Sequence, residues 1–125
     1  MRYLNIVELI MINEALIGKQ SQLRDVDLLE AAVLRPQASA FGEDAYPTIV
    51  DKAAAFFHSL SRNHAFVDGN KRTSTVALIL FLEMNAYDIT WQPEDALEFI
   101  LEVATGAHDV SVLTTWLGNN VVARV

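Results

Sequence analysis

The chain contains a twenty-residue stretch, NHAFVDGNKRTSTVALILFL at positions 63–82, in which a polar loop runs directly into a strongly apolar segment. Residues 76–82 are all apolar, so a helix formed here has no polar face along its middle turns. A helix of that kind is normally surrounded by other helices. Because residues 73–75 are polar, we expect the helix to begin near Thr73 and to open into solvent or a cleft at that end. The stretch therefore predicts a helical bundle around this buried central helix.

Helical patterns also dominate the rest of the chain. Residues 1–17 predict an amphipathic first helix rather than a signal peptide, because Glu8, Asn13 and Glu14 interrupt the apolar run. Caps, prolines and glycines set the other expected boundaries. These boundaries are Asp25 to Pro36, Pro47 onward, Pro93 to Gly106, and Asp109 or Ser111 to Gly118. Residues 37–46 suggest an irregular loop or a small hairpin, residues 87–91 a short extended segment, and residues 119–125 a loose tail.

Length and composition limit the classes of protein to consider. At 125 residues the chain is most simply one domain, 1–125, large enough to bury a core. The formal net charge of −7 argues against direct nucleic-acid binding and against binding to anionic membranes. No apolar run approaches the ~18 residues of a membrane span. There is no cysteine, which excludes disulfides and thiolate metal sites and fits a cytoplasmic location.

The loop before the central helix gathers side chains of complementary chemistry. His64 has an imidazole side chain, which could accept a proton from a hydroxyl group. Asp68 offers the kind of hard oxygen ligand that Mg²⁺ takes together with phosphate oxygens. The backbone N–H groups of Gly69, Asn70 and Lys71 could form an anion-binding nest at the helix start. The loop therefore predicts a phosphate site.

Each of these residues also has a plainer explanation when taken alone. His64 could cap a helix or lie on the surface, Asp68 could be the N-cap of the following helix, and Lys71 and Arg72 could be solvated charges. Arg72 could equally hold phosphate through two charge-assisted bonds. Phe66 is the apolar exception, and we expect it to plug the loop into the core. The convergence of these residues on one helix start favours a nucleotide-phosphate site.

Several other catalytic classes are excluded by the absence of their motifs. The spacing of a Walker A loop is missing, and no serine lies in a nucleophile elbow. His58, His64 and His108 are scattered, with no pair at the i, i+4 spacing that would favour zinc. We expect His58 to be structural or superficial, while Arg62 could reach the site.

The residues from His64 to Arg72, His-Ala-Phe-Val-Asp-Gly-Asn-Lys-Arg, resemble the signature of the Fic/Doc superfamily, and the form with lysine resembles the death-on-curing (Doc) toxins. Further similarities lie at Arg24-Asp25, residues 28–32, Arg35-Pro36-Gln37, Tyr46-Pro47, Phe81-Leu82 and Asn85. The segments described above predict an all-α fold, a compact bundle of about six helices, and the resemblance likewise implies an all-helical core. It also implies a small hairpin flap that positions the target segment, for which residues 37–46 are the candidate.

The resemblance further assigns roles to the loop residues. It makes His64 catalytic, as the base acting on a target hydroxyl, with Asp68, Lys71 and Arg72 as the other catalytic residues. The phosphates of ATP would be bound by Gly69, Asn70, Lys71 and Arg72, and Mg²⁺ by Asp68.

Two positions bear on which group is transferred. Adenylylating members usually carry glycine where this chain has Lys71, and often a second arginine where it has Thr75. Doc-type members resemble this chain at the lysine and transfer the terminal phosphate of ATP to a threonine of elongation factor Tu. We therefore expect a Mg-ATP-dependent kinase. The alternatives are an adenylyltransferase and, in another class, a non-catalytic anion- or partner-binding domain.

Fic proteins are often inhibited by a glutamate within their own chain. Residues 39–44 and 90–95 come close to that inhibitory motif, but each ends Glu-Asp and neither lies on a convincing helix. The resemblance to Doc instead implies inhibition in trans by an antitoxin protein.

Overall fold

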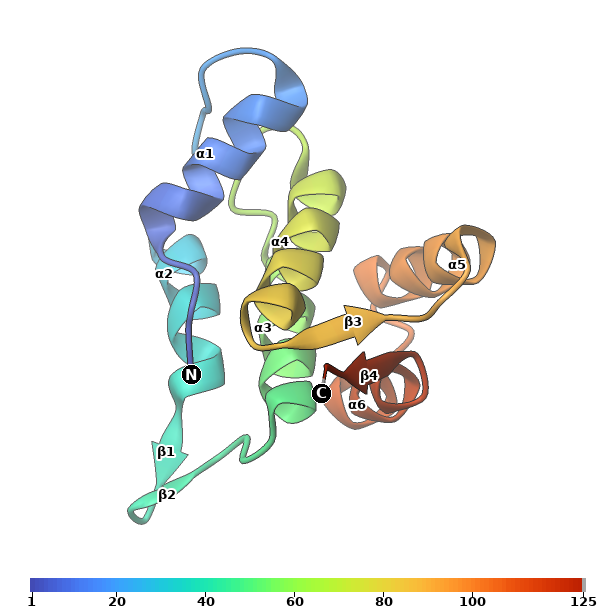
Figure 1. Cartoon of the computed structure of the whole chain (residues 1–125). Coiled ribbons are helices and arrows are strands. Elements are labelled where there is room, and N and C mark those ends of the chain that lie inside the picture. The colour runs from blue at the N-terminus through green and yellow to red at the C-terminus, as the bar shows by residue number, and fades with distance from the viewer. Residues whose placement is uncertain (125) are drawn as a thin grey trace.

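The computed structural model describes residues 1–124, and over this range the chain forms six α-helices with two small antiparallel sheets (Figure 1). The helices are α1 (Ile6–Ile17), α2 (Val26–Leu34), α3 (Ile49–Asn63), α4 (Asn70–Met84), α5 (Pro93–Ala104) and α6 (Val110–Gly118), with a 3₁₀ turn η1 (Arg35–Gln37) after α2. Strands β1 (Ser39–Ala40) and β2 (Glu43–Asp44) pair with each other, as do β3 (Tyr87–Ile89) and β4 (Val121–Ala123). The predicted all-α class is confirmed. No helix in the described range is both long and apolar enough to cross a membrane.

Short polar side chains set most of the helix starts. Asn5, Asp25, Thr48 and Asp109 each accept a hydrogen bond from a backbone N–H in the first turn of the following helix. Such a cap satisfies one of the four donors that a helix start leaves free. The predicted caps at Asp25 and Asp109 are confirmed. The predicted start at Pro47 is wrong by two residues, because Thr48 provides the cap and α3 begins at Ile49.

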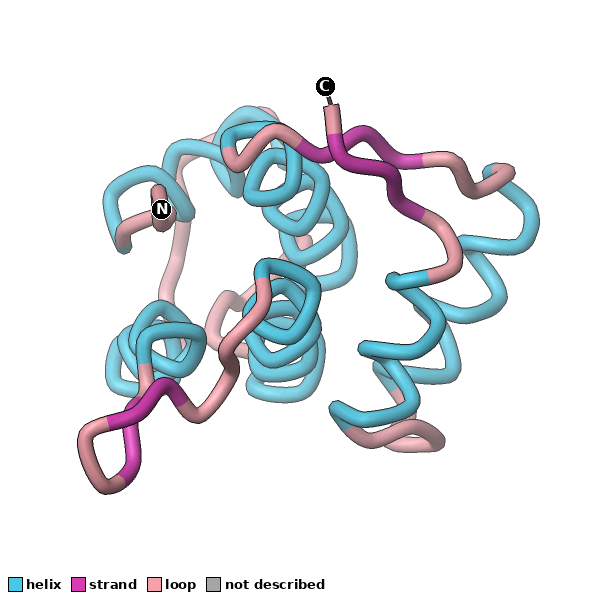
Figure 2. Tube along the Cα trace, turned by 60° about the horizontal axis from the view of Figure 1, so that its bottom comes forward, coloured by secondary structure: helices cyan, strands magenta, loops and turns pink. Residues whose placement is uncertain are grey.

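The central helix is α3 rather than α4, which corrects the sequence-based expectation. Helix α3 contacts α2, α4, α5 and α6 (Figure 2), and residues 52–57 are all buried. Three consecutive alanines at 53–55 let neighbouring helices approach closely. Helix α4 contacts α1, α3, α5 and β3, but Leu80 in its apolar run is 37% exposed. The apolar run at residues 76–82 therefore did not identify α3 as the helix with the most neighbours.

The predicted hairpin at residues 37–46 is present, but it lies at the opposite end of α3 from His64. Ser39 pairs with Asp44, and the Asp44 carboxylate lies 3.5 Å from Nζ of Lys52 in the first turns of α3. Lys52 and the α3 C-cap at His64 are twelve positions apart, which corresponds to a rise of about 18 Å along the helix. The hairpin therefore does not lie over the polar loop, and its expected role as a flap there is not supported by this position.

The expected loose tail at residues 119–125 is also corrected. Val121–Ala123 forms β4 and pairs with Tyr87–Ile89, and Nε of Arg124 lies 3.0 Å from the Asp88 carboxylate. Val125 lies outside the described residues. The partner strand lies more than thirty residues earlier in the sequence, so no local signal announced this pairing.

His58 is structural, as predicted. Its Nδ1 lies 2.9 Å from Nη1 of Arg35, whose Nη1 also donates to the Ser59 hydroxyl. Burial lowers the pKa of His58 below its ordinary value of 6.5, and the positive charges of Arg35 and Arg62 lower it further, against a weaker opposing effect of Asp109.

We expect this lowered pKa to make the fold sensitive to mild acid. Between the folded pKa and 6.5 the unfolded chain binds more protons at His58, so stability falls as pH drops through that window. Thermal unfolding at about pH 7.5 and about pH 5.5 should show a larger fall in Tm for the wild type than for His58→Gln, whose side-chain oxygen can still accept from Arg35. Parallel pH profiles for the two proteins would contradict this assignment.

Candidate functional site

The polar loop connects α3 to α4 and begins at the α3 C-cap. His64 holds this cap in the left-handed conformation, with φ 50° and ψ 49°. Histidine is one of the few non-glycine residues that adopt this region readily. The side chain is exposed, and its ring makes no hydrogen bond within residues 1–124. The imidazole is therefore free to meet a group that approaches from solvent.

Phe66 anchors the loop in the core, which confirms the predicted plug. Its side chain is 2% exposed, and its backbone forms an isolated bridge to Leu23. The Asn70 amide clamps the same residue: the Phe66 N–H donates to Oδ1 at 3.0 Å, and Nδ2 donates to the Phe66 carbonyl at 2.8 Å. Because both ends of this amide bond the loop, Asn70 shapes the turn with its side chain and offers its backbone N–H outward.

Helix α4 begins at Asn70, three residues before the predicted start at Thr73. The N-cap is Gly69, with φ 78°, and it has no side chain with which to cap the helix. Lys71 and Arg72 therefore lie within the first turn of α4, whereas the predicted start placed them before the helix. The prediction erred because a glycine cap in this conformation leaves no polar side-chain signal in the sequence.

The start of α4 differs electrically from the other helix starts in the described range. Four of the others have side-chain caps. Helix α5 also lacks a side-chain cap, but it begins with a proline, which has no N–H, and its first turn carries Glu94 and Asp95, whereas the first turn of α4 has no acidic residue. In α4 the N–H groups of Asn70, Lys71 and Arg72 have no acceptor within residues 1–124. Free N–H groups at a helix start, with a partial charge of about +0.5, attract anions.

The charged side chains around this helix start are exposed and unpaired with one another. Asp68, Lys71 and Arg72 take part in no salt bridge within residues 1–124. Arg72 is nevertheless oriented, because its Nη1 donates to the Leu16 carbonyl in the last turn of α1 at 3.1 Å. Its remaining N–H groups stay available for an anion.

The donor set fits Mg²⁺ only when phosphate supplies further ligands. No group of three or more histidine, aspartate or glutamate side chains in the described range is arranged to hold a metal ion. Mg²⁺ commonly binds through one or two carboxylates together with substrate phosphates and water. A single exposed carboxylate at Asp68, next to a helix start with free N–H groups, is compatible with that pattern.

Helix α1 supports the loop from behind, through contacts that the sequence did not reveal. Asn13 is fully buried, and its Nδ2 donates to the Asp68 carbonyl at 2.8 Å and to Oγ1 of Thr73 at 3.1 Å. A Cβ added to Gly69 would lie 2.7 Å from Cγ2 of Ile17 and 3.0 Å from Nδ2 of Asn13. The only sequence signal was a polar residue within the apolar pattern of residues 1–17, and nothing indicated its partner.

The segment before α2 holds the other side of the loop. The Val67 N–H donates to the Gln22 carbonyl at 2.9 Å, and the Arg24 N–H donates to the Ala65 carbonyl at 2.7 Å. Arg62, which could have reached the site, instead has its guanidinium against Gly106 on the α5–α6 connection. The loop is thus fixed by backbone bonds on one side and by α1 on the other.

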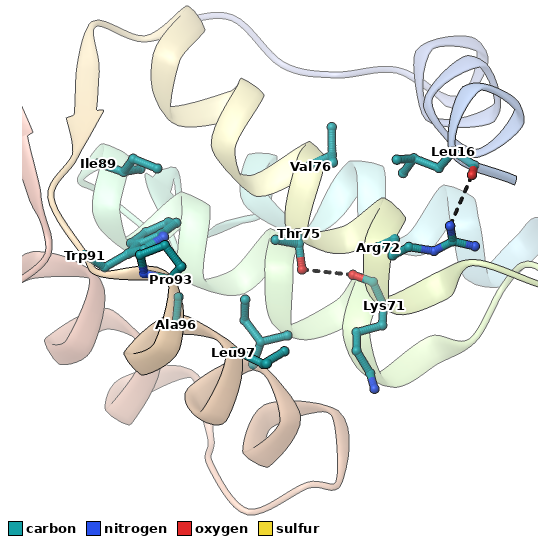
Figure 3. A pocket seen from close by; sticks show the side chains of 11 residues that line it. Leu16, Lys71, Arg72, Thr75, Val76, Ile89, Trp91, Pro93, Ala96 and Leu97 are labelled. Carbon is teal, nitrogen blue, oxygen red and sulfur yellow. Dashed lines mark hydrogen bonds between the residues drawn. The ribbon is translucent and has the colours of Figure 1, made fainter.

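A groove of about 460 Å³ adjoins the α4 start (Figure 3). Lys71 and Arg72 lie at one end, next to Leu16 of α1, and the opposite side is formed by β3 and α5. The other lining residues are mostly apolar: Thr75, Val76, Ile89, Trp91, Pro93, Ala96, Leu97 and Ile100. The Thr75 hydroxyl donates to the Lys71 carbonyl at 2.9 Å, so its proton is not offered to the groove. The groove can take an apolar or aromatic group whose anionic end reaches the cations.

Together, the helical fold and the signature loop define the class. The chain matches the Fic/DOC family over residues 3–82, and it belongs to this family. It is 45% identical over 102 residues to "Toxin Doc" of Mycolicibacterium smegmatis (strain ATCC 700084 / mc(2)155), covering 80% of this chain and 78% of that protein. It is 33% identical over 114 residues to "Protein kinase doc" of Escherichia phage P1, covering 89% of each chain.

Proposed function

We propose that this chain is a Doc-type toxin that transfers the γ-phosphoryl group of ATP to a Ser or Thr hydroxyl of a target protein in the cytoplasm. Elongation factor Tu is the expected target, so the toxin would inhibit translation. The observation that carries the proposal is the uncapped start of α4, where free N–H groups lie beside Lys71, Arg72 and Asp68. The names of the two relatives, one a toxin and one a protein kinase, support the same activity.

The proposed step needs a base and a rigid anion cradle. The target hydroxyl oxygen forms a bond to the γ-phosphorus while the bond to the β,γ-bridging oxygen breaks, and ADP leaves with that oxygen. His64 accepts the hydroxyl proton, and its exposed, unbonded ring suits this role. Bound Mg²⁺ would neutralise phosphate charge, with Asp68 as its protein ligand.

The cations and the helix start would stabilise the transferring group. The N–H groups of Gly69 and Asn70 would cradle phosphate oxygens, while Lys71 and Arg72 offset the negative charge that develops on ADP and the transferring phosphoryl. These groups are already positioned by the fold, since the Leu16 carbonyl holds Arg72 and the Phe66 plug fixes the loop. Positioning of this kind accounts for most of the rate in phosphoryl transfer.

Two features support phosphoryl over adenylyl transfer. Lys71 places a long cationic side chain at the mouth of the groove, where glycine would leave space. Position 75, which often holds a second arginine in adenylylating members, is threonine here, so no second arginine lines the groove. Nucleotide should therefore sit differently from the way it sits in adenylylating relatives.

We further propose that inhibition comes from an antitoxin in trans. Residues 39–44 form the β1–β2 hairpin at the far end of α3, and residues 90–95 become helical only from Pro93. The hairpin offers no helix, and the first turn of α5, which carries Glu94, belongs to the side of the groove opposite Lys71 and Arg72.

Labelled ATP distinguishes the three candidate functions. Purified protein and Mg²⁺ are incubated with elongation factor Tu and ATP labelled at either the α- or the γ-phosphate. Label transferred only from the γ-position supports the kinase, and label transferred only from the α-position replaces it with adenylylation. Nucleotide binding without transfer of either label would leave a binding domain.

We expect Arg72→Ala to weaken ATP binding by about 10- to 100-fold, because each lost charge-assisted bond contributes about 1.5–3 kcal/mol. Calorimetric titration with Mg²⁺ and a non-hydrolysable ATP analogue measures the dissociation constant. Arg2→Ala is the matched control, since it changes net charge equally and Arg2 lies beside Asn85, at the other end of α4. Equal constants for Arg72→Ala and wild type would remove Arg72 from the cradle.

A further inference from the structure

Asn13 is the one fully buried side chain in the described range that carries an amide, and it belongs to neither the signature loop nor the apolar core around it. It lies on α1, more than fifty residues before the loop in sequence. Burying an amide is costly unless its polar atoms are hydrogen-bonded, so the hydrogen-bond partners of Asn13 indicate its role.

Every polar atom of this amide is used. Nδ2 donates to the Asp68 carbonyl at 2.8 Å and to Oγ1 of Thr73 at 3.1 Å, while Oδ1 accepts from the Ser21 hydroxyl. The two acceptors of Nδ2 lie on either side of the α4 start, one before the Gly69 cap and one in the first turns. A single NH₂ group thus bridges the ends of the turn that would hold phosphate.

The bond to Asp68 also fixes the direction of a donor. In a planar trans peptide the carbonyl and the following N–H point in opposite directions. Because the Asp68 carbonyl is directed inward to Asn13, the Gly69 N–H of the same peptide points away from α1. Rotation of this peptide would turn that N–H away from an anion and displace the Asp68 side chain with it.

We propose that Asn13 is a positioning residue for the reaction, holding the Asp68–Gly69 peptide so that the metal-binding carboxylate and the phosphate-binding N–H groups stay aligned. Asn13 touches neither ATP nor the target, and acts through Asp68. This inference rests on the proposed function and deepens it, by assigning to α1 a residue of the same site. Ser21 completes the arrangement by fixing the orientation of the amide.

The test separates positioning from a general structural role. Asn13→Ala is compared with Leu9→Ala, a fully buried residue one turn earlier on α1 that contributes to the core. Both are assayed at a temperature at which thermal unfolding shows each to be folded. We expect Asn13→Ala to raise the Mg²⁺ concentration for half-maximal rate, or to lower kcat, by about 10- to 100-fold. Leu9→Ala should change neither.

Two further variants keep the proposal testable. Thr73→Val removes the second acceptor but keeps the Asp68 bond, so it should lower kcat by less than Asn13→Ala does. Ser21→Ala is a milder change, so it should lower kcat less than Asn13→Ala does. It replaces Asn13→Ala as the test variant if Asn13→Ala does not fold. The proposal is overturned if Asn13→Ala and Ser21→Ala both leave kcat and the Mg²⁺ requirement unchanged. It is also overturned if kcat falls as far in Leu9→Ala as in Asn13→Ala. The same holds if kcat falls as far in Thr73→Val as in Asn13→Ala.

A readout that does not depend on turnover distinguishes this inference from the proposed function. Backbone amide chemical shifts of residues 68–72 in the free protein should move in Asn13→Ala and remain in place in Leu9→Ala. If the wild type transfers no phosphate, the proposed function fails, while these shifts still show whether Asn13 holds the turn. Unmoved shifts in Asn13→Ala would overturn the positioning role even in an active enzyme.

Discussion

His64→Asn is expected to lower kcat for target phosphorylation by about 10²–10⁴-fold, the contribution of a positioned general base. Asparagine tolerates the left-handed conformation that His64 adopts at φ 50°, so the backbone of the α3 C-cap should be preserved. Its amide cannot take up the hydroxyl proton. The dissociation constant for ATP should remain close to that of wild type, because His64 contributes no phosphate contact.

The matched control is His108→Gln, which removes a histidine on the α5–α6 connection, where it stacks on Phe99 and contacts Glu102. This variant should retain wild-type kcat. His64→Ala should lose transfer as fully as His64→Asn, at some additional cost in stability from the positive φ. Undiminished turnover in His64→Asn would exclude His64 as the base.

Phe66→Ala is expected to reduce the free energy of unfolding by about 3–5 kcal/mol, the usual range for truncating a buried phenylalanine. The side chain is 2% exposed, and the backbone on both sides is bonded to Asn70 and to the segment before α2. Such a loss is a large share of a typical stability of about 5–15 kcal/mol. Urea denaturation measures it, and the loosened loop should also weaken ATP binding.

Val67→Ala provides the neighbouring control. Val67 is 56% exposed, so its truncation should change stability by no more than about 0.5 kcal/mol. If Phe66→Ala is too unstable to purify, Phe66→Leu should show a smaller loss in the same direction. Equal stability of Phe66→Ala and Val67→Ala would show that the loop is held by its backbone bonds alone.

Sequence patterns predicted the features whose causes are local. Asp25 and Asp109 cap the helices that follow them, and an apolar residue among polar ones marked Phe66 as the plug. The signature loop could be recognised in the sequence because its residues are contiguous. The start of the helix that follows it was misjudged, since the cap at Gly69 depends on a backbone conformation rather than on a side chain.

Features that depend on distant partners were missed. Asn13 donates a hydrogen bond to the Asp68 carbonyl, fifty-five positions later in the sequence, and β4 pairs with β3 although two helices lie between them in the chain. The position of the β1–β2 hairpin follows from the direction in which α3 runs, which no local motif specifies. Likewise, which of the two helices α3 and α4 becomes central depends on how the other helices pack around them.

A crystal structure with Mg²⁺ and a non-hydrolysable ATP analogue tests the central claim most directly. We predict phosphate oxygens within hydrogen-bonding distance, about 2.7–3.2 Å, of the backbone N–H groups at the start of α4, with Arg72 on the same phosphates and the metal ion on Asp68. A triphosphate bound at another surface, with the N–H groups of Asn70, Lys71 and Arg72 facing only water, would contradict the account.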